Sequence, residues 1–198
     1  MIISEYQYDY LFELLQSGLP QVTETVNSFL GVNIRIDKVE LEVRLDKEEF
    51  QEFQGTNLVA ISQLFRGSCE GYGELLIERS KLREIAQSSY DDFGTGLDFY
   101  EFMIDIRKEL TNLIVNSALG LLGNPLMLSH EFSVPVYREP YIEELDQYLI
   151  DDLPLLEIRF NLELGIKGEK SIFRVMIPSR SLLLIQDCLV RLSPRLKA

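Results

Sequence analysis

Glu109 and Asn112 are the residues of this 198-residue chain whose types and spacing could do chemistry. On a helix, residues three apart are surface neighbours, with Cβ atoms about 5–6 Å apart. The carboxylate can pair with a cation on a partner, and the primary amide can offer both an acceptor and a donor to one water molecule. Neither group is a strong nucleophile, and the sequence shows no Ser/His/Asp or Cys/His arrangement, so covalent catalysis is not expected. The pair favours a reaction in which a water molecule is positioned.

Both residues belong to a polar stripe on a helix predicted over 101–122. Asp105, Glu109, Asn112 and Asn116 follow an i, i+4, i+7, i+11 spacing, which places them within a wedge of about 60°. A different face of this helix is apolar and wide enough to bury, with Phe102, Met103, Ile106, Leu110, Leu113 and Leu121. We therefore expect the polar stripe to lie outside. Two Asn residues there are unusual, because Asn is a poor helix former.

The run Asp105-x3-Glu109-x2-Asn112 and, after 22 further residues, Pro135 resembles an active-site signature. It is that of the CheC/CheX/FliY family, phosphatases of the phosphorylated chemotaxis response regulator. The resemblance implies that Asn112 holds the attacking water while Glu109 binds the active-site Lys of the receiver domain. It also implies that Asp105 positions the helix or touches the partner, and that Pro135, through its fixed φ, shapes the strand beside the site. Asn116 replaces a Gly of the family pattern, so the backbone of the partner would approach less closely there.

The resemblance implies an activity, that of a protein-aspartyl-phosphate phosphatase in chemotaxis or related two-component signalling. The Mg²⁺, the phosphorylated Asp and the Lys would all be present on the receiver domain, so this chain is expected to bind no cofactor and no metal itself. Phosphoryl transfer asks mostly for positioning and charge neutralisation, and a side-chain amide that orients water has this role in GTPases. The missing element that the chain would supply is the group that holds water in line with the acyl phosphate.

The motif recurs near the start of the chain, where Asp9-x3-Glu13-x2-Gln16 reproduces it at a shift of 96 residues. This copy departs from the pattern, because Gln16 replaces Asn and Val39 stands where Pro is expected. A Gln amide reaches one methylene further and would miss the water by about 1 Å, which can cost ~10²-fold in rate. We predict that this copy is a degenerate second site, with docking of a partner as the role left to it.

The expected elements repeat in the same order in two halves, about 5–95 and 98–196. Alternating and helical hydrophobic periodicity predicts helix 5–30, strand 32–45, strands 57–65 and 73–77 and helix 80–88, then helix 98–122, strand 126–137, strands 153–164 and 170–177 and helix 179–192. Pro20 is expected to end or kink the first helix. The predicted fold is α/β (α+β): one domain over 1–198, internally duplicated with pseudo-twofold symmetry, with two long helices on one continuous, mainly antiparallel sheet.

Composition narrows the choice of partners. A formal charge of −13 argues against nucleic acid and against an anionic membrane surface, and it suits a partner with a basic face. The two cysteines, Cys69 and Cys188, and the single His130 form neither a disulfide framework nor a zinc site, which predicts a reducing compartment, the cytoplasm. No apolar stretch approaches the ~20 residues that a membrane span requires. The sequence does not decide between a monomer and a homodimer.

Two readings of other classes stand beside the phosphatase. The first is a non-catalytic module of the same fold that binds a receiver, a CheD-like deamidase or a flagellar switch protein. The degenerate copy at Asp9, Glu13 and Gln16 and the departure at Asn116 favour it. The second is an unrelated ligand-binding domain, which would need a deep apolar pocket. A lone Glu-x2-Asn pair is most often solvated surface, so the joint spacing with Pro135 and the repeat carry the functional hypothesis.

Overall fold

The computed structural model describes residues 4–30, 34–44, 58–93, 96, 98–138, 155–164 and 169–192. Its elements are α1 (Glu5–Leu30), β1 (Ile34–Arg44), β2 (Leu58–Gly67), β3 (Gly71–Glu78), α2 (Arg79–Phe93), α3 (Phe99–Leu126), β4 (His130–Phe132), β5 (Val136–Arg138), β6 (Leu155–Leu164), β7 (Glu169–Pro178) and α5 (Ser179–Leu192). The order of helices and strands is the one expected from the hydrophobic periodicity, except that β4 and β5 replace the one strand expected over 126–137. The predicted ends at 31–33, 45, 57 and 153–154 lie outside the described residues.

One sheet carries all of the described strands. Their order is β1-β6-β7-β3-β2-β4, with β5 also pairing with β2, and the pairings are antiparallel. The order is symmetric about its centre. From one edge to the middle the strands are β1, β6 and β7, and from the other edge their equivalents are β4 with β5, then β2, then β3. A pseudo-twofold axis therefore passes between β3 and β7. The expected fold class is confirmed, while the repeat bounds of 5–95 and 98–196 stay a prediction.

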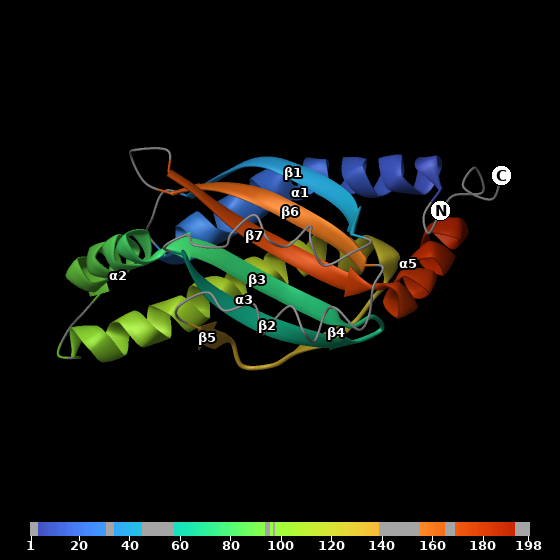
Figure 1. Ribbon diagram of the computed structural model, residues 1–198. Coiled ribbons are helices and arrows are strands. Elements are labelled where there is room, and N and C mark those ends of the chain that lie inside the picture. The colour runs from blue at the N-terminus through green and yellow to red at the C-terminus, as the bar shows by residue number, and fades with distance from the viewer. Residues whose placement is uncertain are drawn as a thin grey trace.

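The long helices α1 and α3 lie side by side on one face of the sheet, with α2 and α5 at opposite ends of the molecule (Figure 1). The face of the sheet beneath α1 and α3 is apolar and joins both helices in one core cluster. The helices approach closely at Gly18, where an added Cβ would lie 2.2 Å from Leu121 Cδ2. Pro20 lies inside α1, which continues as a helix to Leu30, so the helix does not end at Pro20.

Helix α3 is longer than its periodicity predicted. Asp98 caps its first turn, because its Oδ1 accepts a hydrogen bond of 2.8 Å from the backbone N–H of Tyr100. The helix runs past Pro125 to Leu126, and Met127 ends it in the left-handed conformation at φ 56°. The strand expected over 126–137 is consequently shorter and interrupted, with β4 beginning at His130 and β5 at Val136.

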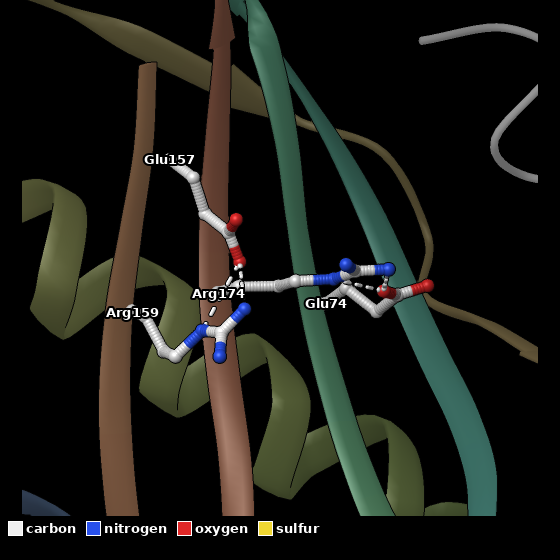
Figure 2. A network of polar contacts seen from close by, with 4 residues as sticks. All are labelled: Glu74, Glu157, Arg159 and Arg174. Atoms are coloured by element: carbon white, nitrogen blue, oxygen red, sulfur yellow. Dashed lines mark hydrogen bonds and ion pairs between the residues drawn. The ribbon is translucent and has the colours of Figure 1, made fainter. Parts of the chain in front are cut away.

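The opposite face of the sheet is also buried at its centre. Glu74 of β3 and Arg174 of β7 face each other across the axis, and each side chain is 1% exposed. Their closest contact, from Arg174 Nε to Glu74 Oε2, is 2.6 Å, and Glu157 and Arg159 of β6 form a second pair beside them at 3.2 Å (Figure 2). Removal of one partner from a buried ion pair costs about 3–5 kcal/mol. The centre of this face is therefore structural.

Candidate functional site

The polar stripe of α3 faces outward, as expected. Asp105 and Glu109 are exposed, and Asn112 and Asn116 are partly exposed. Among the described residues the Glu109 carboxylate has no ion pair or hydrogen bond. Asp105 Oδ1 lies 3.9 Å from Lys108 Nζ, an exposed pair of little energetic value. Glu109 is thus available to a cation on another molecule.

The amide of Asn112 is fixed from below by β2. Gln63, which is 2% exposed, donates from Nε2 to Asn112 Oδ1 at 2.9 Å. The same Nε2 donates to the backbone carbonyl of Ser133 at 2.8 Å. Asn116, one turn further along α3, donates from Nδ2 to Asn112 Oδ1 at 3.1 Å. These bonds join α3, β2 and the segment between β4 and β5 at one point.

Two donors on Asn112 Oδ1 change the expectation that this amide offers one water both an acceptor and a donor. A carbonyl oxygen has two lone pairs, and Gln63 and Asn116 use both. Within the described residues no group accepts a hydrogen bond from Asn112 Nδ2. The group available to a bound water is therefore the NH₂ of Asn112.

Pro135 lies in the interruption between β4 and β5, at the edge of the sheet. Both of these strands pair with β2, and residues 133–135 stand opposite Gln63 and Leu64 alone. Ser133 accommodates the extra residue, because its N–H donates to the Leu64 carbonyl at 2.9 Å and its Oγ accepts from the Leu64 N–H at 3.1 Å. Proline has no N–H for a strand ladder, which suits it to such an interruption. The Ser133 carbonyl is left to accept from Gln63.

A glycine lets α3 come close to the sheet at the level of the amides. Gly73 of β3 is the ladder partner of Gln63. A Cβ at Gly73 would lie 2.6 Å from Cγ2 of Val115, which is buried on α3. A side chain at Gly73 would therefore clash with Val115, so the glycine lets α3 pack this close to the sheet.

The first copy of the motif has different surroundings. Asp9, Glu13 and Gln16 are exposed on α1. Counted from the first residue of each strand, the counterpart of Gln63 is Phe160 of β6, whose ladder partners are Val39 and Phe173. Pro20 lies four residues after Gln16 and so takes the place that Asn116 has after Asn112. Proline has no side-chain amide that could donate to Gln16. Within the described part of the chain, Gln16 makes no hydrogen bond through its side chain.

Gln63 is the site residue that the sequence motif on α3 does not include. The positions of β2 that face the helices are Val59, Ile61, Gln63 and Phe65, so one amide interrupts a core-facing apolar row. Its Oε1 is buried with no partner among the described residues. A buried acceptor left unpaired costs about 1–3 kcal/mol. A polar residue in a core-facing row is the signal that could have found it.

Cys69 and His130 lie in contact below the same edge of the sheet, with Cys69 Sγ 3.1 Å from His130 Nε2. Burial raises the pKa of the Cys69 thiol to about 11. Burial also lowers the pKa of His130. Both groups are therefore neutral near pH 7, and the pair supplies no thiolate nucleophile. Both Cys69 and Cys188 are free thiols.

The described part of the chain shows no cluster of three or more His, Cys, Asp or Glu side chains that could hold a metal ion. A pocket of about 190 Å³ lies between α1 and α3 beside Asn116, and its lining is mainly polar: Gln21, Val22, Thr25, Asn116, Ser117, Gly120, Leu121 and Asn124. It does not favour the binding of a large apolar ligand. No described helix has the length and hydropathy needed to cross a membrane.

Solved structures with the same arrangement of helices and strands include three named proteins. FliY of Thermotoga maritima aligns with a TM-score of 0.66 at 18% identity, over 98% of this chain and 100% of FliY. The FliM middle domain of H. pylori aligns at 0.63 with 10% identity, over 94% and 99% of the two chains. The chemotaxis protein CheX of Desulfovibrio desulfuricans aligns at 0.54 with 10% identity, over 83% and 99%.

The chain has the fold of FliY, FliM and CheX. No protein-family model matches the sequence. The search of curated proteins finds no match either. At these identities the likeness concerns the fold, an α+β single domain with helices on an antiparallel open sheet. The FliY, FliM and CheX fold therefore identifies the scaffold, and the chemistry has to be argued from the residues on α3.

Proposed function

We propose that this chain hydrolyses the aspartyl phosphate of a phosphorylated receiver domain of the CheY type. The observation that carries the proposal is the surface of α3. There, an exposed and unpaired Glu109 stands one turn before an amide, Asn112, that is partly exposed and hydrogen-bonded from below. Glu109 pairs with the active-site Lys of the receiver, and Asn112 holds the attacking water in line with the phosphorus atom.

The reaction needs little covalent work from this chain. Water adds to phosphorus while the bond between phosphorus and the aspartyl oxygen breaks. The products are the free Asp carboxylate and inorganic phosphate (HPO₄²⁻), which keeps one proton of the water, while the other proton is released to solvent. The receiver carries the Mg²⁺ that neutralises developing charge, so the contribution of this chain is positioning. A well-oriented group is worth orders of magnitude in rate, and a displacement of about 1 Å can cost 10²-fold.

Charge supports a partner whose binding surface is locally basic. The chain has a formal charge of −13, and Asp105 and Glu109 add two exposed carboxylates beside the amide. Carboxylates alone would repel a phosphoryl group. A receiver that brings a Lys and Mg²⁺ with its phosphate removes this repulsion, whereas a free phosphate monoester would not.

Asp105, Asn116 and Pro135 have supporting roles in this proposal. Asp105 contacts the partner one turn before Glu109. Asn116 holds the Asn112 carbonyl, and Pro135 keeps the segment between β4 and β5 in the shape that presents the Ser133 carbonyl. The pseudo-equivalent Asp9, Glu13 and Gln16 form a degenerate site without catalysis. The proposal includes a cytoplasmic location and makes no choice on a CheD-like regulator or on a homodimer.

A second candidate function is that of a non-catalytic interaction module of the same fold. The FliM domain of H. pylori, solved in complex with FliG, aligns with this chain at a TM-score of 0.63 and 12% identity. The exposed aromatic residues of α1, Tyr6, Tyr8 and Phe12, lie beside the first copy of the motif and would suit a docking face. In this function the chain binds a receiver or a flagellar switch protein and leaves the phosphate intact.

One assay separates the two functions. A CheY-like receiver domain is phosphorylated with a small phosphodonor in Mg²⁺, and its decay is followed with and without this chain. The phosphatase accelerates decay at substoichiometric concentration, and Asn112→Ala removes about 10²-fold of the acceleration while binding is kept. Binding without any acceleration by the unaltered chain would select the module instead.

A further inference from the structure

We infer that Gln63 is a positioning residue, which orients the Asn112 amide so that its NH₂, and not its carbonyl, faces the receiver. The inference rests on the proposed phosphatase function and deepens it. Gln63 does not touch the substrate. It acts through the contact of its Nε2 with Asn112 Oδ1 at 2.9 Å.

The orientation of the three amides follows from one backbone carbonyl. The Ser133 carbonyl can only accept a hydrogen bond, so the atom of Gln63 that lies 2.8 Å from it must be the nitrogen. The second hydrogen of that nitrogen points to Asn112, and its partner there must be the oxygen. Asn116 then donates to the same oxygen at 3.1 Å. Reversal of the Asn112 amide would set its NH₂ against two donors.

The orientation decides how a water is held. With both lone pairs of Oδ1 occupied, Asn112 can only donate to the attacking water through Nδ2. A water that accepts this bond through one lone pair keeps its second lone pair for the phosphorus atom. Its two protons remain directed away from the amide, toward the phosphoryl oxygens or solvent. The Asn112 carbonyl is thus not the acceptor of the proton that leaves the water.

Gln63 packs poorly as a core residue, which indicates that it serves the site and not the stability of the core. It occupies a helix-facing row with Val59, Ile61 and Phe65, and it is 2% exposed. Its Oε1 has no partner among the described residues, which destabilises the fold relative to an apolar side chain of the same length. Residues that break a local rule without a gain in stability are expected at functional sites.

The test separates a positioning role from a structural one. Gln63→Met keeps the length of the side chain and removes both hydrogen bonds, and Gln63→Leu serves if the Met variant does not fold. We expect unfolding temperatures close to that of the unaltered chain, because the two lost hydrogen bonds of Nε2 are offset by removal of the unpaired Oε1 from the core. We expect a 10- to 100-fold lower kcat in the receiver decay assay, with the KM for the phosphorylated receiver within about twofold, because Glu109 still docks it.

A double-mutant cycle then shows whether Gln63 acts through Asn112. In the Asn112→Ala background, Gln63→Met should lower kcat no further, because the amide it orients is absent. Matched Phe160→Met, at the counterpart position under α1, should leave kcat unchanged. An unchanged kcat in Gln63→Met, or losses that multiply in the double variant, would overturn the inference while leaving the phosphatase intact.

A readout without activity keeps the inference testable if the chain proves to be no phosphatase. The side-chain ¹⁵NH₂ group of Asn112 should be rigid in solution, with an NMR order parameter near 0.85, and it should fall below about 0.6 in Gln63→Met. The side chain of Gln16, which is exposed and has no such partners, is the flexible reference. A mobile Asn112 in the unaltered chain, or one that stays rigid in Gln63→Met, would contradict the proposal.

Discussion

The sheet under α3 and the sheet under α1 occupy equivalent places in the fold and have different surfaces. Under α3, Gln63 pairs with Gly73. Gly73 leaves space for the helix to approach, and Gln63 donates two hydrogen bonds from its side-chain Nε2. Under α1, the corresponding pair is Phe160 and Phe173, whose ring centroids lie 5.6 Å apart at 30°. The two helices carry nearly the same motif. What distinguishes them is the layer beneath, which fixes the amide on one side only.

The difference separates stability from activity. Phe160 and Phe173 are almost fully buried and belong to the main core cluster, whereas Gln63 leaves a carbonyl unpaired in the same core. Large buried aromatic rings stabilise the fold, while a partly satisfied buried amide does not. At these equivalent positions the sheet under α1 therefore serves packing, and the sheet under α3 serves the site.

The largest expected effect is on stability, at Phe160. Phe160→Ala should lower the free energy of unfolding by about 3–5 kcal/mol, because a buried ring is replaced by a cavity. The kcat of the protein that remains folded should change less than twofold, since Phe160 lies under α1 and not under α3. Urea unfolding and the decay assay at low temperature measure the two quantities. A large loss of kcat without a loss of stability would reverse the roles assigned to the sheet under α1 and the sheet under α3.

An intermediate effect is expected at the two exposed glutamates of the motif. Glu109→Ala should raise the KM for the phosphorylated receiver about tenfold, which corresponds to roughly 1.4 kcal/mol and is reasonable for an ion pair partly buried by the partner. Glu13→Ala, the matched change on α1, should raise it less than twofold. Initial rates at several receiver concentrations measure both. Equal effects of the two substitutions would mean that both helices dock the receiver alike.

The smallest expected effect is on the pH dependence of the free energy of unfolding, at His130 of β4. Burial lowers the pKa of His130 below its unfolded value of about 6.5, so the unfolded chain binds more protons below that pH. The contribution of neutral His130 is complete above about pH 6.5 and is lost as the pH falls from there toward its folded pKa. His130→Gln should therefore show a flatter stability profile between pH 7 and 5 in urea titrations. Parallel profiles would assign the acid sensitivity to other groups.

Much of the fold could be predicted because periodicity reports burial. The outward polar stripe of α3, the alternation of helices with runs of strands and the terminal helix at 179–192 follow from hydrophobic spacing alone. The positions of the helix ends were predicted less accurately from the sequence. Pro125 lies in the last turn of α3 and Pro20 lies inside α1, where packing against the sheet and against the other helix outweighs the cost of proline.

The motif on α3 was visible because its residues are close in sequence, whereas its support is not. Gln63 lies 49 residues from Asn112 and 70 from Ser133, and it is the strand pairing that brings them together. No local pattern links these residues, and an amide in the core-facing row of β2 does not by itself name its partners. The direction of the Asn112 amide likewise depends on long-range hydrogen bonds, so the sequence allowed both orientations.

The most direct test of the account compares Asn112→Ala with Gln16→Ala in one receiver decay assay. Both substitutions truncate an amide at the same place of the same motif, and both side chains are at least partly exposed, so each variant should fold as the unaltered chain does. The account predicts that Asn112→Ala lowers the accelerated decay by about 10²-fold and that Gln16→Ala leaves it within twofold. Equal losses in the two variants, or a fully active Asn112→Ala, would contradict it.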